Sequence, residues 1–298
     1  MKRLDIHVPH EFFEYVRLSD DSVPEARADR IDVAILDMNH NWLNLGHDAL
    51  VHVVLEAAET LREELAARNA KVRVVSFDVR QRNVVPPADR FHIFIGTGGP
   101  GHLDPRLNDG KSEWSQGVDE TTEWEAPLFH LFDDILADED AALIAVCHSF
   151  GLVCRWSGIA TPALRAEKST GLRINRLSRE AMHHPWFEQF ARELPDHQHF
   201  HVVDNRLFDL ILQDAGKSMP IAFEAAGSSA LTMVELARDA TGAMPRFLAY
   251  NHHPELMDRE HGLQVLEEKR AHNEVPDQKW YDERYSTIMD LFGEQERQ

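Results

Sequence analysis

Short apolar runs alternate with longer amphipathic segments along the first half of the chain, and this alternation restricts the fold more than any other feature. Residues 32–38, 71–77, 91–96 and 142–147 are apolar runs of strand length, whereas 47–68 and 126–137 repeat apolar side chains with helical spacing. Strands that alternate with helices in this way pack as a parallel sheet joined by crossover helices. The first half of the chain therefore predicts an α/β fold.

A cysteine follows the fourth of these runs directly. Leu143 to Val146 lead into Cys147, and small residues stand close to it on both sides. A sharp strand-to-helix turn exposes the side chain at its tip, and only small neighbours let the backbone turn so tightly. Taken alone, a cysteine after an apolar strand is more often a buried packing residue. The pattern nevertheless makes Cys147 a candidate nucleophile, with the next amide facing a developing oxyanion.

Two further segments supply what a cysteine nucleophile needs. Strand 91–96 ends in a glycine cluster that contains Gly98 and Gly99, and such a loop exposes backbone amides to a substrate carbonyl. The apolar run 247–250 is followed by His253 and, two residues later, by Glu255. A cysteine nucleophile requires a base, and the base requires a group that orients it.

Together these segments resemble the class I glutamine amidotransferase family, whose marks are a Gly-Gly-Pro-Gly loop, a Gly-x-Cys-x-Gly-x-Gln elbow and a late His-Pro-Glu. The resemblance covers roughly residues 31–260. It implies a three-layer open, mostly parallel sheet flanked by helices, flavodoxin-like and of the class I amidotransferase type. It also implies Cys147 as the nucleophile, His253 as the general base and then acid, and Glu255 as the orienting group. The oxyanion and substrate-binding positions would be those of Gly98, Gly99, His148 and Gly151.

The elbow departs from the family's pattern. Ala145 replaces the first glycine, Ser149 replaces the second, and Gly151 replaces the glutamine that helps to hold the substrate amide. Two alternatives therefore stay open. In peptidase-like and glyoxalase-like relatives of this fold the histidine next to the cysteine, here His148, is the catalytic one. A chain that no longer captures an amide would instead be a non-catalytic binding or regulatory subunit.

The leading prediction is an enzyme, an amidotransferase-like amide hydrolase. A glutamine or γ-glutamyl amide would acylate Cys147 and release ammonia or an amine. Because no fused synthase domain is apparent, a separate synthase subunit stays open as a partner, as does a homo-oligomer. We expect residues 1–30 to be an N-terminal extension, 31–260 the amidotransferase-like domain, and 261–298 a C-terminal helical extension packed on that domain.

The composition argues against several other classes. With 31 basic and 51 acidic residues the formal charge is −20, which repels phosphate backbones and disfavours nucleic acid as a partner. The two cysteines, Cys147 and Cys154, are seven residues apart, about two turns of a helix, so no disulfide is expected. Unpaired thiols, no signal-peptide pattern after Met1 and no long apolar span predict a cytoplasmic protein without a membrane partner. The 18 histidines form no spaced zinc motif, so neither a metal nor another cofactor is predicted.

The remaining segments give weaker signals. The alternation in 171–177 predicts a strand, and 199–212 reads as a strand that turns into a helix. The polar stretch 98–125 is too long for a turn and predicts either a lid or a solvated loop. Apolar spacing in 279–292 predicts a helix that packs on the core or on another subunit.

Overall fold

A computed structural model describes residues 4–18, 22–115, 117–213, 216, 218–226, 230–256 and 258–293. Residues 1–3, 19–21 and 294–298 of the two expected extensions lie outside the described residues. The strands are β1 Phe13–Arg17, β2 Arg30–Asp37, β3 Lys71–Asp78, β4 Ile93–Gly96, β5 Ala142–Val146, β6 Ala160–Leu177, β7 His199–Leu212, β8 Met219–Glu224, β9 Ala230–Arg238 and β10 Pro245–Tyr250. The α-helices are α1 Gly46–Thr60, α2 Arg62–Ala67, α3 Val79–Arg82, α4 Glu125–Ala137, α5 His148–Ser157, α6 Phe187–Glu193, α7 Arg259–Ala271 and α8 Gln278–Gly293.

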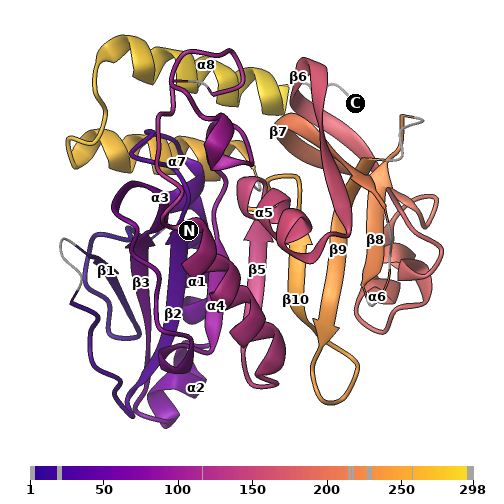
Figure 1. Cartoon of the computed structure of the whole chain (residues 1–298). Helices are drawn as coiled ribbons and strands as arrows, with labels where there is room; N and C mark the ends of the chain where they lie inside the picture. Colours follow the sequence, from indigo (N-terminus) through magenta and orange to yellow (C-terminus); the bar gives the residue numbers. More distant parts are fainter. Residues whose placement is uncertain are drawn as a thin grey trace.

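One half of the sheet is parallel, in the order β1-β3-β2-β4-β5-β10 (Figure 1). Alternate residues of β2 face opposite sides of the sheet, as the period of a strand requires. Val33 and Ile35 pack in a cluster with residues of α1, and Ala34 and Leu36 pack in a cluster with residues of α4 and α5. Because these strands are parallel, the loops that leave β2, β4, β5 and β10 all start from the same edge.

The other half of the sheet overturns the predicted fold class. β6 pairs antiparallel with β7 and β8, and β9 pairs antiparallel with the same two strands, so the four strands close into a barrel. β10 is also antiparallel to β9, so among the described residues five strand pairings are antiparallel and five are parallel. The prediction of a three-layer open, mostly parallel, flavodoxin-like sheet is therefore wrong.

The lengths of the connections explain the difference. A parallel neighbour requires a crossover of about a dozen or more residues, whereas a turn can join antiparallel strands. Only residues 225–229 separate β8 from β9, and only 239–244 separate β9 from β10. The segment 199–212 is a single strand rather than a strand that turns into a helix. Its side chains alternate between more and less buried from Asp204 to Leu210, which is a strand period.

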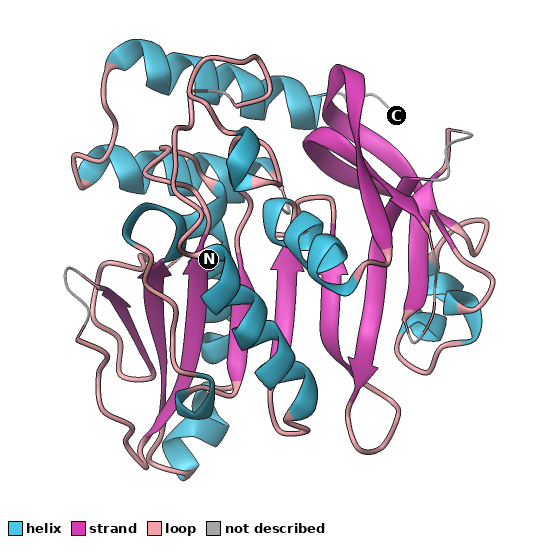
Figure 2. Ribbon diagram, viewed as in Figure 1, coloured by secondary structure: helices cyan, strands magenta, loops and turns pink. Residues whose placement is uncertain are grey.

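The chain ends are part of this architecture. β1 adds a parallel edge strand beside β3. The predicted helix at 279–292 is confirmed as α8, which packs with α7 and with Val203 of the barrel in one apolar cluster. Figures 1 and 2 show α7 and α8 lying across the end of the sheet at which the parallel strands finish. Helix α8 therefore reaches the part of the fold where the functional loops emerge.

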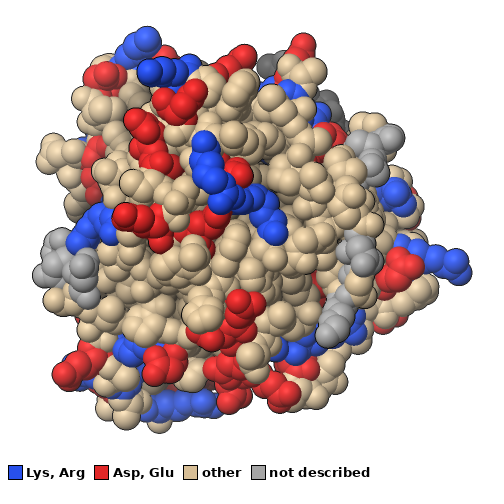
Figure 3. Space-filling model, viewed as in Figure 1, with Lys and Arg blue, Asp and Glu red and all other residues tan. Residues whose placement is uncertain are grey.

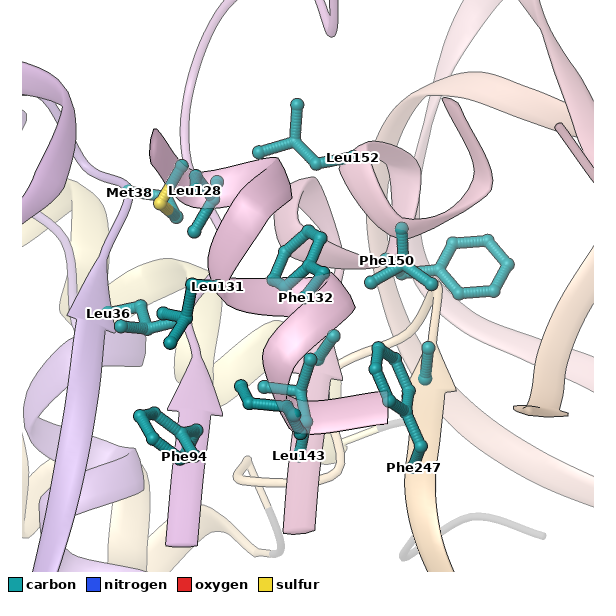
Figure 4. Close-up of a cluster of buried hydrophobic side chains, with 14 of the residues drawn as sticks. Leu36, Met38, Phe94, Leu128, Leu131, Phe132, Leu143, Phe150, Leu152 and Phe247 are labelled. Carbon is teal, nitrogen blue, oxygen red and sulfur yellow. The ribbon is translucent and has the colours of Figure 1, made fainter. Parts of the chain in front are cut away.

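The largest apolar cluster lies between the sheet and helices α4 and α5. Figure 4 shows Phe94, Leu143 and Phe247, from three neighbouring strands, beside Leu131 and Phe132 of α4. All five side chains are buried. This packing fixes α5, and with it the turn that begins the helix, against a rigid sheet.

The surface agrees with the composition. Figure 3 shows charged side chains interspersed with broad uncharged areas on one face. Among the described residues no helix combines the length and the apolar character that crossing a membrane requires.

Candidate active site

A cavity of about 820 Å³ lies where the loops after β4, β5 and β10 meet the barrel. These three loops bring Gly98, Cys147 and His253 to its wall, and strand β7 and helix α8 close its other sides. Open α/β sheets bind ligands at the carboxyl ends of their parallel strands, and a cavity of this size holds a small molecule. The three sequence segments that were singled out separately thus border one space.

Cys147 occupies the turn between β5 and α5. Its backbone angles are φ 51° and ψ −99°, a conformation that costs a non-glycine residue energy and persists only where its surroundings impose it. The Cys147 amide donates a hydrogen bond to the Tyr250 carbonyl (2.7 Å), and its carbonyl accepts one from Gly151 (3.1 Å). The turn has the strained strand-to-helix geometry expected of a nucleophile elbow.

His253 lies between Cys147 and Glu255. Its Nδ1 is 2.7 Å from Glu255 Oε1, and the imidazole also makes a hydrogen bond with Cys147. Burial alone would lower the pKa of His253, but the neighbouring charges of Glu255 and Cys147 outweigh that effect and raise the pKa well above its usual value. The imidazole is therefore placed to exchange a proton with the thiol while the carboxylate holds its orientation.

Glu255 is only 1% exposed and sits at the beginning of α1. A β-carbon on Gly46, the first residue of that helix, would lie 3.2 Å from Glu255 Oε1. The positive end of the helix dipole favours a negative charge at this place. Helix α1 therefore helps to keep the orienting carboxylate ionised in a buried position.

The glycine loop lies against the thiol. A β-carbon on Gly98 would be 3.4 Å from Cys147 Cβ and 3.2 Å from His253 Cε1. The backbone N–H groups of Gly99 and His148 donate no hydrogen bond within the described part of the chain. Two unengaged amides beside a nucleophile are the arrangement that an oxyanion requires.

The sequence analysis did not identify the group that fixes this loop. Arg80 is fully buried and donates hydrogen bonds of 2.8 Å to the carbonyls of Met38 and Pro100. Its other nitrogens pair with Glu120, which belongs to the stretch 98–125 (2.5 Å). Glu120 also accepts hydrogen bonds from Asn108 and Trp124, so at these residues the stretch is folded inward rather than a solvated loop. No sequence pattern links a residue after β3 to the glycine loop, and only the fold reveals this brace.

His148 has a different environment from His253. Its ring is buried, and burial, with Arg80, Arg155 and His102 nearby, lowers its pKa well below the usual value. The ring is therefore neutral, and the charged groups that act on it are cations rather than a carboxylate. This geometry favours His253 over His148 as the base that serves Cys147.

Gly151 is covered by an apolar side chain. A β-carbon at this position would lie 2.4 Å from Leu103 Cδ2 and 2.6 Å from Leu103 Cδ1. Leu103 is itself buried in the main core cluster and comes from the stretch 98–125. The place from which a glutamine side chain would extend toward a substrate amide is therefore filled by leucine.

Two groups of potential metal ligands occur among the described residues, and neither includes a residue of the cavity. They are Asp5 with His7 and His272, and His7 with Asp48 and Glu274. In the second group Lys269 already pairs with Asp48 (2.6 Å) and with Glu274 (3.2 Å). These carboxylates thus have an internal cation as their partner.

No protein-family model and no curated protein matches the chain. Among solved structures, a glutamine amidotransferase from Thermotoga maritima is 12% identical over 88% of this chain and 94% of its own, with a TM-score of 0.49. A glutamine amido transferase from Methylobacillus flagellatus is 12% identical over 88% and 95%, with a TM-score of 0.48. A Thermoplasma acidophilum protein that is named for one of the subunits of GMP synthase is 14% identical over 90% and 96%, with a TM-score of 0.45. The predicted resemblance to glutamine amidotransferases thus extends to solved structures.

Proposed function

We propose that the protein is a cysteine-dependent amide hydrolase of the class I glutamine amidotransferase type, which cleaves a γ-glutamyl amide. The observation that carries this proposal is the strained backbone of Cys147, placed in a cavity beside a buried His253–Glu255 pair. Strain of this kind accompanies nucleophile elbows, and a cysteine that only packed would have no need of a base and an orienting carboxylate.

In the proposed reaction Cys147 Sγ transfers its proton to His253 and attacks the amide carbonyl. The backbone amides of Gly99 and His148 stabilise the oxyanion that forms. His253 then gives the proton to the leaving nitrogen, the carbon–nitrogen bond breaks, and ammonia or an amine departs. Water attacks the thioester, with His253 accepting its proton, and the free γ-carboxylate leaves as the thiol is restored.

The contact between Leu103 and Gly151 supports a further expectation about the substrate. With no polar side chain extending from position 151, the amide loses one or two hydrogen bonds, each worth about 1–3 kcal/mol. Free glutamine should therefore be hydrolysed roughly ten- to several-hundred-fold less efficiently than by a typical glutaminase. Brisk, saturable glutamine hydrolysis by the isolated chain would contradict this expectation.

Covalent trapping tests the proposed function most directly. The purified chain is incubated with a γ-glutamyl chloromethyl ketone, and intact-mass and peptide spectra locate the adduct. One adduct on Cys147, prevented by an excess of a hydrolysable γ-glutamyl amide, is expected. The Cys147→Ala variant is the control and should remain unlabelled. If Cys147 is not labelled and no amide in a panel of glutamine and γ-glutamyl amines is cleaved, the chain is a binding protein rather than a hydrolase.

A further inference from the structure

A second carboxylate, Asp204, stands in the wall of the same cavity. It lies on β7, it lines the cavity together with His253, and its side chain has no exposed surface. One oxygen, Oδ2, accepts a hydrogen bond from Ser169 Oγ (2.6 Å) and lies 3.4 Å from an Arg206 nitrogen. The residue carries no part of the bond-breaking chemistry proposed above.

The other oxygen of Asp204 has no partner. Oδ1 is buried and accepts no hydrogen bond from any side chain or backbone group in the described ranges. A buried acceptor without a donor loses about 1–3 kcal/mol of hydration, more if it is charged, so native proteins rarely retain one without a use for it. Because Asp204 borders the cavity, a bound molecule can supply the missing donor.

Neighbouring groups hold this carboxylate still. Arg206 is buried and also donates to Glu224 (2.7 Å) and to Asp209 (3.2 Å), so its guanidinium is tied on three sides and cannot swing toward Oδ1. Ser169 anchors the opposite oxygen. The free oxygen is therefore pre-organised, which reduces the entropy lost when a ligand binds to it.

A cationic donor suits this oxygen best. Hydrogen bonds from an ammonium group to a carboxylate are roughly twice as strong as neutral ones. A second polar group, Asn251, also lines the cavity and has an unpartnered, buried amide nitrogen within the described residues, which can donate to an oxygen of the same ligand. An ammonium group with a nearby acceptor is the chemistry of an α-amino acid.

We infer that Asp204 is a specificity residue that binds the α-ammonium group on the acyl portion of the substrate. This inference rests on the proposed function, and it goes further by assigning the residue that distinguishes γ-glutamyl amides from amides of plain dicarboxylic acids. Asp204 contacts substrate directly and does not act through His253.

A matched pair of chromogenic amides tests the inference. γ-L-Glutamyl-p-nitroanilide and glutaryl-p-nitroanilide differ only in the α-ammonium group, and both release p-nitroaniline. The wild-type chain should prefer the first in kcat/KM by about 10- to 150-fold, the value of one charged hydrogen bond. In Asp204→Asn that preference should fall to a few-fold, mainly through KM, with the pH profile of kcat unchanged. Asp209→Asn, which alters the same arginine network without lining the cavity, should keep the wild-type preference.

Direct binding keeps the test independent of turnover. Calorimetry with the Cys147→Ala chain should show that L-glutamine binds more tightly than glutaramate, which lacks the α-ammonium group, and that adding Asp204→Asn removes the difference. Equal binding of the two ligands by the Cys147→Ala chain overturns the inference even if the amides are cleaved. An Asp209→Asn variant that loses the preference equally, or an Asp204→Asn variant in which only the pH profile of kcat moves, also overturns it. If no amide is cleaved but the binding preference holds, the proposed function fails and the ammonium site stands.

Discussion

Alanine substitutions at the two adjacent glycines of the loop after β4 should separate catalysis from folding. At Gly98 a methyl group would lie 3.2 Å from His253 Cε1 and 3.4 Å from Cys147 Cβ, a tight fit that small shifts of side chains can relieve. Gly→Ala at a compatible backbone gains about 0.4–1 kcal/mol by restricting the unfolded chain, which offsets part of this contact. We expect the free energy of unfolding of Gly98→Ala to stay within about 1 kcal/mol of wild type.

At Gly99 the same methyl group would lie 2.2 Å from the Met38 carbonyl oxygen and 2.9 Å from its carbon. Both are backbone atoms, and the oxygen accepts a hydrogen bond from the buried Arg80. Overpacking costs about 1–3 kcal/mol, and a lost hydrogen bond to a charged group costs about 1.5–3 kcal/mol. Gly99→Ala should therefore lose about 2–6 kcal/mol of stability as the loop moves away from Arg80.

Urea unfolding followed by tryptophan fluorescence, together with amide hydrolysis, measures both effects. Gly98→Ala should fold almost as well as wild type but lose about 100-fold in activity, because a methyl group between thiol and imidazole displaces them from reacting geometry. Gly99→Ala should lose both stability and activity. The reasoning is refuted if Gly98→Ala is as unstable as Gly99→Ala, or if it keeps full activity.

Three further predictions follow from the site. Iodoacetamide should alkylate Cys147 but not Cys154 in the native chain, since Cys154 is fully buried and burial raises its pKa; a peptide map showing equal labelling would contradict this. His253→Ala should lower kcat/KM on the order of a thousandfold or more, and His148→Ala far less; the reverse order would support the neighbouring-histidine mechanism. Burial also raises the pKa of Asp204, so ionising it costs stability, and this cost is absent near pH 3.8 and grows as pH rises through the raised pKa. Urea titrations should therefore find Asp204→Asn more stable relative to wild type at pH 7 than at pH 4, and a difference that shrinks with rising pH would refute the assignment.

Local sequence was enough to predict the elements of the parallel half and the residues that end them. β2, β3, β4 and β5 are apolar runs of the predicted length, and α4 follows helical spacing within one residue of the predicted 126–137. Spacing and residue type could do this because a strand's period and the small residues of a tight turn are local properties. The sequence likewise determined that a cysteine, a histidine and a carboxylate would each follow the end of an apolar strand.

Tertiary structure decided the rest, because it depends on contacts between residues that are far apart in the chain. The polar alternation of β6 and β7 fits an open sheet as well as a closed barrel, and only the pairing of β9 with both β7 and β8 distinguishes them. Arg80 braces the glycine loop, Leu103 covers Gly151, and Asp204 borders the cavity near His253, yet none of these three has a local signature. Their roles arise from packing and from buried charge, and these exist only once the chain has folded.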